Sequence, residues 1–401
     1  MKLLKINEVV NENLCIGCGI CTNFSNGSKI DYNNEGFLTV SGYEHKSNKI
    51  TEEDLVNEVC PGIKTFAVEN IKDNVWGDYK EIFLGYSTND EIRFKGSSGG
   101  TITQTLVYLI ENNLVDYVIH IQQDEKDVLG NKVIITNDIN SIINNTGSKY
   151  CPSSPLNEVL NNLDRNLKYA FVGRPCDVVA LRNYEKLDES IKKIILYKIS
   201  FFCAGTPSIE GTMKVLEKFS INKKDIIDFR YRGNGWPGFT TAVNALGEEF
   251  KMPYADSWGK ILNRHLHPRC KICPDGVGMS ADLVFGDGWD CDEKGYPVFA
   301  EGSGKSLAVV RNKIGEDLIN RLIADKRIER EVFLKENLKF VQPYQFERRT
   351  TLTARLNAMR LFNRTIPKYE CGIKKTSKYQ SRKKQLKTFL GTVKRIVNKR
   401  I

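Results

Sequence analysis

A run of three closely spaced cysteines near the amino terminus constrains this chain more than any other feature. Cys15, Cys18 and Cys21 occur in the sequence C-I-G-C-G-I-C. A C-x2-C-x2-C run lets one tight loop place three thiolates on three irons of a cubane cluster, and the glycines between them allow close backbone approach. The spacing therefore predicts a ferredoxin-like 4Fe–4S segment at the start of the chain.

The fourth ligand of this cluster has to come from elsewhere in the chain. Bacterial two-cluster ferredoxins continue the run with three residues and another cysteine, but Ser25 stands at that position here. Cys60, which a proline follows, is the remote cysteine we predict as the fourth ligand. The alternative is a structural zinc ion, which also takes four cysteines but usually from two C-x2-C pairs.

The length and the amino-terminal sequence limit the class of protein. A chain of 401 residues predicts two or three domains. The first residues, MKLLKINEVVNEN, turn polar before a signal-peptide core could form, and no apolar run approaches the roughly 18 residues of a membrane-spanning helix. We therefore expect a cytoplasmic protein, in which 11 cysteines serve metal binding or redox chemistry rather than disulfides.

The net charge of +10 is concentrated in the carboxy-terminal tail. Residues 374–401 contain 11 Lys and Arg and no Asp or Glu, so the rest of the chain has a net charge near −1. Because the charge is local, we expect no nucleic acid partner. An apolar face on a basic tail helix predicts contact with an anionic membrane surface or an acidic partner, and a solvated, frayed tail is the alternative. The residues of that face are Leu386, Phe389, Leu390, Val393 and Val397.

Strand patterns alternate with helical patterns over about residues 80–215, which predicts an α/β architecture. The expected strands are 116–123, 132–136, 168–173 and 194–203. A helix should follow the sequence KGSSGG, with Ser97 or Ser98 as its N-cap and Ile102 and Leu106 on its apolar stripe.

The fold class we predict is α/β (mixed α+β), with a ferredoxin-like segment before an α/β core and a basic helical tail after it. The predicted division has four parts. They are the ferredoxin-like segment 1–75, the first part of the core 76–215, the second part of the core 216–345 with its C-x2-C pair, and the tail 346–401.

A second group of cysteines is spread over the predicted core. Cys270 and Cys273 form a C-x2-C pair that suits zinc, a redox dithiol or half of a cluster. Cys176 and Cys203 follow predicted strands, and parallel strands deliver such residues to one edge of a sheet. Spacing alone leaves shared ligation open, because Cys176 and Cys203 could equally be small buried apolar side chains.

Six segments of the core occur together in a fixed order. They are SSGG (97–100), GSKYCPSSP (147–155), GRPCDVVALRNY (173–184), FFCAGTP (201–207), RCKIC (269–273) and ADLVFGDGW (281–289). Over about residues 80–330 this set resembles the coenzyme F420 hydrogenase/dehydrogenase beta-subunit family. The resemblance implies that Cys176, Cys203, Cys270 and Cys273 hold one 4Fe–4S cluster. With the amino-terminal cluster, the layout is also similar to that of 7-hydroxymethyl chlorophyll a reductase, a two-cluster flavoprotein.

The same resemblance implies bound FAD, lined by a glycine-rich helix start and a later loop. The positions that it implies are Ser98, Gly99, Gly100, Thr101, Gly147, Lys149 and Tyr150. The free N–H groups and dipole of a helix start suit a pyrophosphate, and Lys149 can offset negative charge. For SSGG alone, an ordinary capped turn is the alternative.

Several residues that could carry chemistry fall outside these assignments. His265 and His267 precede the C-x2-C pair, where a histidine could shuttle protons beside a flavin or simply pack. We expect Cys151 to pack near the flavin, Cys291 to be structural and Cys371 to be an unpaired thiol near the tail.

The predicted function is an oxidoreductase with two 4Fe–4S clusters and FAD. It would pass electrons between ferredoxin, or a deazaflavin such as coenzyme F420, and a small-molecule or saccharide substrate, in surface-polysaccharide synthesis. One alternative is an electron-transfer subunit of a larger hydrogenase or dehydrogenase complex. The other is a zinc-stabilised binding protein without redox activity.

Overall fold

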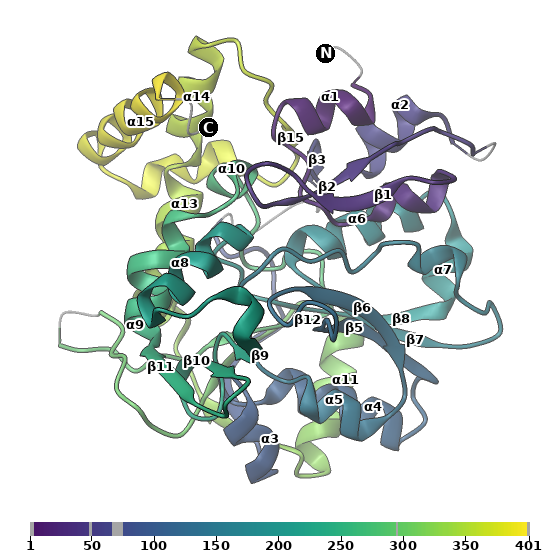
Figure 1. The fold of residues 1–401 in the computed structure, drawn as a ribbon, viewed down its shortest axis with the longest axis vertical. Coiled ribbons are helices and arrows are strands. Elements are labelled where there is room, and N and C mark those ends of the chain that lie inside the picture. Colours follow the sequence, from purple (N-terminus) through teal and green to yellow (C-terminus); the bar gives the residue numbers. More distant parts are fainter. Residues whose placement is uncertain (1–3, 48–49, 66–74, 294–295, 399–401) are drawn as a thin grey trace.

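A mixed sheet forms the centre of the protein in the computed structural model, which describes residues 4–47, 50–65, 75–293 and 296–398 (Figure 1). Its eight strands lie in the order β14-β4-β13-β12-β8-β7-β5-β6. The strands are β4 (Glu81–Ser87), β5 (Tyr117–Gln123), β6 (Asn131–Thr136), β7 (Tyr169–Val172), β8 (Ile195–Phe201), β12 (Leu283–Asp287), β13 (Ser306–Val310) and β14 (Ile328–Val332). The mixed α/β class and the four strands predicted from the sequence are confirmed.

Parallel pairing is confined to the middle of the sheet. Strands β5, β7, β8 and β12 pair in parallel, with Leu283 opposite Ile199 and Val118 opposite Ala170. The outer strands β6, β13, β4 and β14 are antiparallel to their neighbours. Every residue of β13 is buried, as expected for a central strand whose two faces are covered.

Helices cover both faces of this sheet, with one group below it and another above it in Figure 1. The lower face packs an apolar core against α3 (Asp90–Lys95), α4 (Thr101–Glu111), α5 (Ile139–Asn144) and α11 (Lys313–Ala324). The upper face packs against α6 (Pro175–Glu185), α7 (Glu189–Ile194), the amino-terminal segment and the carboxy-terminal helices. The two cores fix the sheet between two layers of helix.

The serine cap predicted for α4 is wrong. The N-cap is Gly100 at φ +70°, and a Cβ there would lie 2.6 Å from the Ile92 carbonyl oxygen. Ser98 instead donates to the Lys305 carbonyl at 2.7 Å, and the Ser97 hydroxyl accepts from the Ser148 N–H. A left-handed turn pressed against α3 requires glycine, so the two serines are free to bind other segments.

The amino-terminal segment forms a small layer on top of α6. Its elements are α1 (Ile6–Asn11), β1 (Lys29–Tyr32), β2 (Leu38–Ser41), α2 (Glu52–Asp54) and β3 (Lys64–Thr65). The Thr22 hydroxyl accepts from Glu158 N–H at 2.9 Å, and the Cys18 carbonyl accepts from Leu156 N–H at 3.0 Å. These bonds join the segment to the core. Residues 66–74, at the end of the predicted ferredoxin-like segment, lie outside the described residues.

A second, antiparallel sheet of three strands lies to one side of the central one. It consists of β9 (Ile226–Arg230), β10 (Phe239–Asn244) and β11 (Glu249–Pro253), with α8 (Ile209–Phe219), α9 (Tyr254–Asp256) and α10 (Pro268–Lys271) nearby. The loop between β9 and β10 brings Arg232 back toward the central sheet, where it meets Asp287 at the end of β12.

The carboxy-terminal region returns to the amino-terminal layer. It contains α12 (Leu338–Val341), α13 (Pro343–Thr350), α14 (Leu352–Leu361), β15 (Lys368–Tyr369) and α15 (Arg382–Val397). Strand β15 pairs in parallel with β3, which joins the carboxy-terminal region to the amino-terminal layer (Figure 1). No helix of the described residues has the length and apolarity that a membrane crossing needs. The predicted boundaries of the four parts stay a prediction, and residues 399–401 of the tail are not described.

Candidate functional site

The structure brings the remote Cys60 to the loop that carries the other three cysteines of the first set. Its thiol interacts electrostatically with those of Cys15, Cys18 and Cys21. Backbone hydrogen bonds surround the sulfurs: the Gly62 and Ile63 backbone lowers the pKa of Cys60, although burial dominates and raises it to about 12. Such hydrogen bonds to sulfur hold and tune iron–sulfur clusters.

Two glycines make this loop tight. Gly17 has φ +65° and Gly19 has φ +83°. A Cβ on Gly17 would strike the Leu38 carbonyl oxygen, and one on Gly19 would lie 2.5 Å from the Asn157 nitrogen. The loop therefore fits between the β1–β2 hairpin and the core only because neither residue has a side chain.

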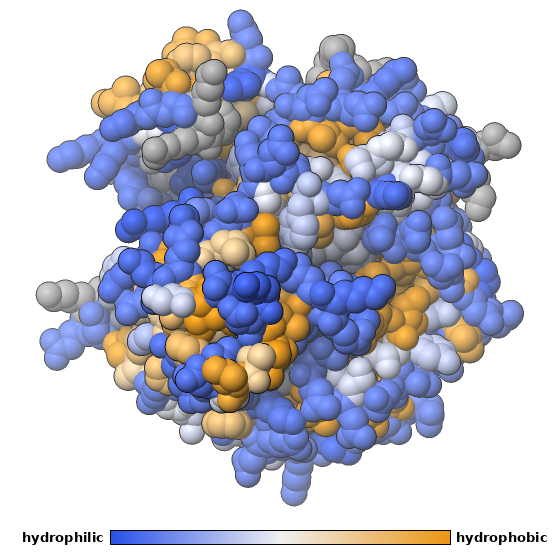
Figure 2. Space-filling model, viewed as in Figure 1, coloured by the Kyte–Doolittle hydropathy of each residue, from blue (hydrophilic) through white to orange (hydrophobic). Residues whose placement is uncertain are grey.

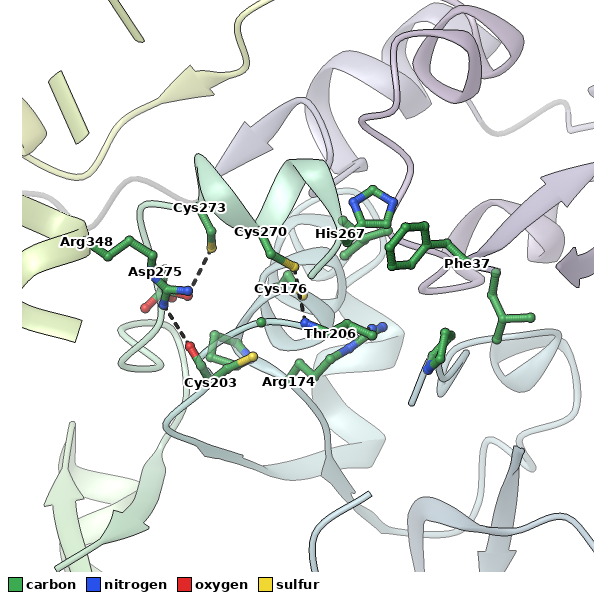
Figure 3. Close-up of a pocket in the computed structure, with 15 residues that line it drawn as sticks. Phe37, Arg174, Cys176, Cys203, Thr206, His267, Cys270, Cys273, Asp275 and Arg348 are labelled. Carbon is green, nitrogen blue, oxygen red and sulfur yellow. Dashed lines mark hydrogen bonds between the residues drawn. The ribbon is translucent and has the colours of Figure 1, made fainter. Parts of the chain in front are cut away.

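The second set comes together from four separate segments (Figure 3). Cys176 lies in the first turn of α6, Cys203 follows β8, and Cys270 and Cys273 lie in and just after α10. All four line one cavity. Their thiols interact electrostatically with one another, and burial raises the pKa of Cys203 to about 12. The parallel strands β7 and β8 do deliver Cys176 and Cys203 to one edge of the sheet.

Buried thiols of raised pKa fit an iron–sulfur cluster on chemical grounds. Removing their protons in an apolar interior is costly unless a metal compensates the negative charge, and a metal then binds with proton release. Within the described residues, no three His, Cys, Asp or Glu side chains are grouped closely enough for one metal ion. A cubane places each thiolate on its own iron and so tolerates wider spacing than zinc, whose ligands sit about 2.3 Å from one centre.

Buried arginines surround the second set. Arg174, Arg269 and Arg348 are 7%, 4% and 3% exposed. Arg174 forms an ion pair with Asp177, at 2.8 Å for each of two nitrogens, and interacts with Cys15 of the first set as well as Cys176. Arg269 binds the carbonyls that follow Cys60, since it donates to Pro61 and Gly62 at 2.9 Å. Two of these arginines therefore lie between the two sets.

A much larger cavity, of about 510 Å³, lies beside the second set. Six of the seven predicted flavin positions line it: Ser98, Gly100, Thr101, Gly147, Lys149 and Tyr150. Gly99 is the exception, because it packs against β4 and β13, where its N–H donates to the Ser306 hydroxyl at 3.0 Å. A pocket of a few hundred cubic ångströms with a few polar groups is typical of a cofactor site.

Lys149 supplies positive charge to this cavity. Its ammonium donates to the Asn145 carbonyl at 2.6 Å. Burial, and then the nearby charge of Arg230, lowers the pKa of Lys149 to about 8. An anionic group of a ligand would replace these unfavourable surroundings with an ion pair, so the cavity suits a phosphate-bearing molecule.

Another part of the lining of the large cavity contains a buried ion pair that the sequence analysis did not predict. Arg232 is 1% exposed and binds both carboxylate oxygens of Asp287 at 2.8 Å. The guanidinium lies over the rings of Tyr254 and Trp289, at 4.4 and 5.0 Å from their centroids. Trp236 stacks on Trp289 at 4.7 Å from behind, since it does not itself line the cavity. The signal was present in YRGNGWPG (231–238) and FGDGW (285–289).

The two cavities share a wall. Arg174, Cys203, Gly205 and Thr206 line both of them. The smaller cavity is also lined by Ile16, from the loop of the first set, and by Phe37 and Leu38 of the amino-terminal hairpin. The cavity of the second set therefore adjoins both the loop of the first set and the large cavity.

His267 and His265 take different places. His267 is buried and lines the cavity of the second set, where its Nδ1 accepts from the Arg269 N–H at 3.1 Å. Burial, more than the neighbouring cations, lowers the pKa of His267 to about 3, and its ring also bonds to the Cys15 backbone. His267 therefore links the two cysteine loops. Neither His265 nor His267 lines the large cavity.

The three leftover cysteines take different places, and Cys371 interacts electrostatically with Cys273 of the second set. Cys151 is 3% exposed, lines the large cavity and accepts from the Asn131 amide at 2.8 Å. Cys371 is fully buried beside Arg349, whereas Cys291 is exposed in a loop.

Two family models match consecutive parts of the chain. Residues 82–161 match the family model for the amino-terminal part of the coenzyme F420 hydrogenase/dehydrogenase beta subunit, and residues 166–334 match the family model for its carboxy-terminal part. The chain is 30% identical to the F420-dependent formate dehydrogenase subunit beta of Methanocaldococcus jannaschii over 142 residues, which are 35% of this chain and 37% of that protein.

Two further similarities cover more of the chain. The coenzyme F420 hydrogenase subunit beta of Methanococcus voltae is 25% identical over 295 residues, 67% of this chain and 99% of that one. A chain of the F420-reducing [NiFe] hydrogenase complex from Methanosarcina barkeri aligns with a TM-score of 0.56 and 19% identity, covering 73% of this chain and 96% of that one. The latter similarity concerns the fold.

Proposed function

This chain belongs to the coenzyme F420 hydrogenase/dehydrogenase beta-subunit family, and from that membership we propose that it is an electron-transferring subunit of a larger oxidoreductase complex. It holds one 4Fe–4S cluster on Cys15, Cys18, Cys21 and Cys60. It holds a second on Cys176, Cys203, Cys270 and Cys273, and FAD in the large cavity.

The shared wall between the two cavities is the observation that carries this proposal. Cys203 lines both, so a cluster on the second set would be in contact with a flavin in the large cavity. Ile16, from the loop of the first set, lines the cavity of the second set, so the two clusters would be neighbours. Close, fixed spacing of redox groups in a buried interior is what a protein contributes to electron transfer.

The residues of the large cavity have separate tasks in this proposal. Lys149 and the free N–H groups at the start of α4 bind the anionic part of the ligand. The aromatic wall of Tyr254 and Trp289, held by Arg232 and Asp287, packs against a planar ring and excludes water. A bound flavin would exchange single electrons with the clusters and electron pairs with a small carrier.

The names of the relatives favour this subunit role over a self-contained reductase. Two of them are beta subunits of F420-linked dehydrogenase or hydrogenase enzymes, so we propose coenzyme F420 or ferredoxin as the carrier and further subunits as partners. Those names give a surface-polysaccharide role no support.

Anaerobic purification tests the proposal. We expect a brown protein with about eight irons per chain, two clusters of four, and one flavin. Reduced viologen should bleach the flavin, and the reduced protein should then reduce F420. A colourless protein with about two zinc ions per chain and no flavin would instead establish the zinc-stabilised alternative.

The basic tail helix supports a contact with an anionic membrane surface. Helix α15 packs on α14 and leaves Leu386, Leu390 and Val397 at 59%, 56% and 63% exposure. Figure 2 shows hydrophobic residues at the upper left, where α15 lies in Figure 1, among hydrophilic ones. Sedimentation with anionic and neutral vesicles tests this contact. Binding to anionic vesicles alone, lost in Leu390→Gln, supports it, and no binding to either rejects it.

A further inference from the structure

Arg348 lies against the second cysteine set, and all its hydrogen-bond acceptors are neutral. It comes from α13 and donates to the Cys203 carbonyl at 2.7 Å, to the Ala204 carbonyl at 3.1 Å and to the Gln345 amide oxygen at 2.6 Å. Figure 3 shows its side chain entering the cavity of the four cysteines. Residue 348 is also beyond residue 334, where the family match ends.

The cysteines that interact most strongly with Arg348 all belong to the second set. They are Cys203, Cys270 and Cys273. Arg174 and Arg269, by contrast, interact with cysteines of both sets. A buried positive charge close to one set stabilises added negative charge there more than at the other set.

Two carboxylates near the second set offset part of the positive charge. Asp177 forms an ion pair with Arg174. Asp275 lines the same cavity as Arg348 and accepts from the Val277 and Met279 N–H groups. With three arginines against these two acids, an excess of positive charge remains around the second set.

We propose that Arg348 raises the reduction potential of the second cluster above that of the first, and so directs electrons from the amino-terminal segment toward the large cavity. The proposal rests on the two clusters of the proposed function. Reduction adds one negative charge to a buried group, and a nearby cation of low solvent exposure stabilises that charge strongly. One electron leaves the first cluster and enters the second, with no bond made or broken.

An EPR-monitored redox titration of the anaerobic holoprotein measures both potentials. The Cys18→Ala variant, which keeps only the second set intact, assigns the signal of the second cluster. We expect the second cluster to be reduced first as the potential is lowered. A first cluster that is reduced before the second would overturn the proposal, even with both clusters and flavin present. Absence of iron would overturn the proposed function instead.

Substitution of Arg348 then tests its role. In Arg348→Gln, the ratio of reduced to oxidised second cluster at a fixed potential should fall about tenfold, which is 59 mV for one electron. The first cluster should not move. Arg348→Lys keeps the charge and should restore most of the ratio, and Arg360→Gln, on the exposed face of α14, is the matched control.

Iron content separates a structural effect from an electrostatic one. If Arg348→Gln loses the second cluster, the potentials of Arg348→Lys and of the unsubstituted protein still test whether the charge of Arg348 raises the potential of the second cluster. Equal potentials in Arg348→Gln, Arg348→Lys and the parent protein would show that the charge of Arg348 does not set the order.

Discussion

The two cysteine sets of this protein are built in opposite ways. Three members of the first lie on one loop, and backbone N–H groups and two glycines shape it. The second is assembled from α6, the end of β8 and the α10 loop. The carboxy-terminal region then holds that loop in place: Arg355 donates to the Lys271 carbonyl, Tyr369 to Ile272 and Arg349 to Pro274. A local loop depends on its own sequence, whereas the second set depends on the whole fold.

The largest expected effect follows from removing a ligand of the second set. Cys273→Ala should lose about four irons per chain, since one cubane no longer has its ligands. Reduction of the flavin by viologen should fail as well, because Cys203 of the same set lines the flavin cavity. Iron analysis and flavin bleaching measure the two effects. Cys291→Ala, an exposed cysteine, should change neither.

Removal of a ligand from the first set should have a narrower effect. Cys18→Ala should also lose about four irons, but flavin should remain bound, because no residue of this set lines the large cavity. The same iron and flavin assays, with viologen as a small donor, check it. Unchanged iron content would show that this set binds no cluster, and loss of flavin would show that the two sites are not separable.

The tightness of the first loop predicts a smaller effect on stability. Gly19→Ala forces a side chain into a left-handed conformation and against Asn157, at a cost of about 2–3 kcal/mol in the free energy of unfolding. Gly27 is the matched control, since it has φ +82° but open space around it, and Gly27→Ala should cost only about 1 kcal/mol. Urea unfolding measures both. Equal costs would mean that contact with the core does not shape this loop.

The smallest expected effect concerns the carboxy-terminal support of the second set. Tyr369→Phe removes a 2.6 Å hydrogen bond to the Ile272 carbonyl, between Cys270 and Cys273, and should cost about 1 kcal/mol. Iron should then leave the second set faster in the presence of a chelator and leave the first at the old rate. Tyr379→Phe, on an exposed tyrosine, should have no effect. If iron left both sets faster to the same extent, the carboxy-terminal region would not support the second set specifically.

Local patterns in the sequence were sufficient for several predictions about the fold. The strands β5 to β8 match their predicted ranges, and helix α4 follows KGSSGG as predicted, because alternation and apolar stripes report directly on burial. The N-cap of α4 was missed, since Gly100 is selected by contact with Ile92 of another helix. The wall of Arg232 and Asp287 was missed for a similar reason: an ion pair between residues 55 positions apart leaves no local pattern.

The sequence alone determined the candidate ligands of the first set, because the C-x2-C-x2-C spacing places three cysteines on one short loop whatever the rest of the fold. Only the tertiary structure decided which segments face each other. It placed Cys60 at that loop, gathered the second set beside Arg348 and joined its cavity to the larger one through Cys203. Contacts between distant segments depend on how strands pair and helices pack, and no spacing along the chain records that.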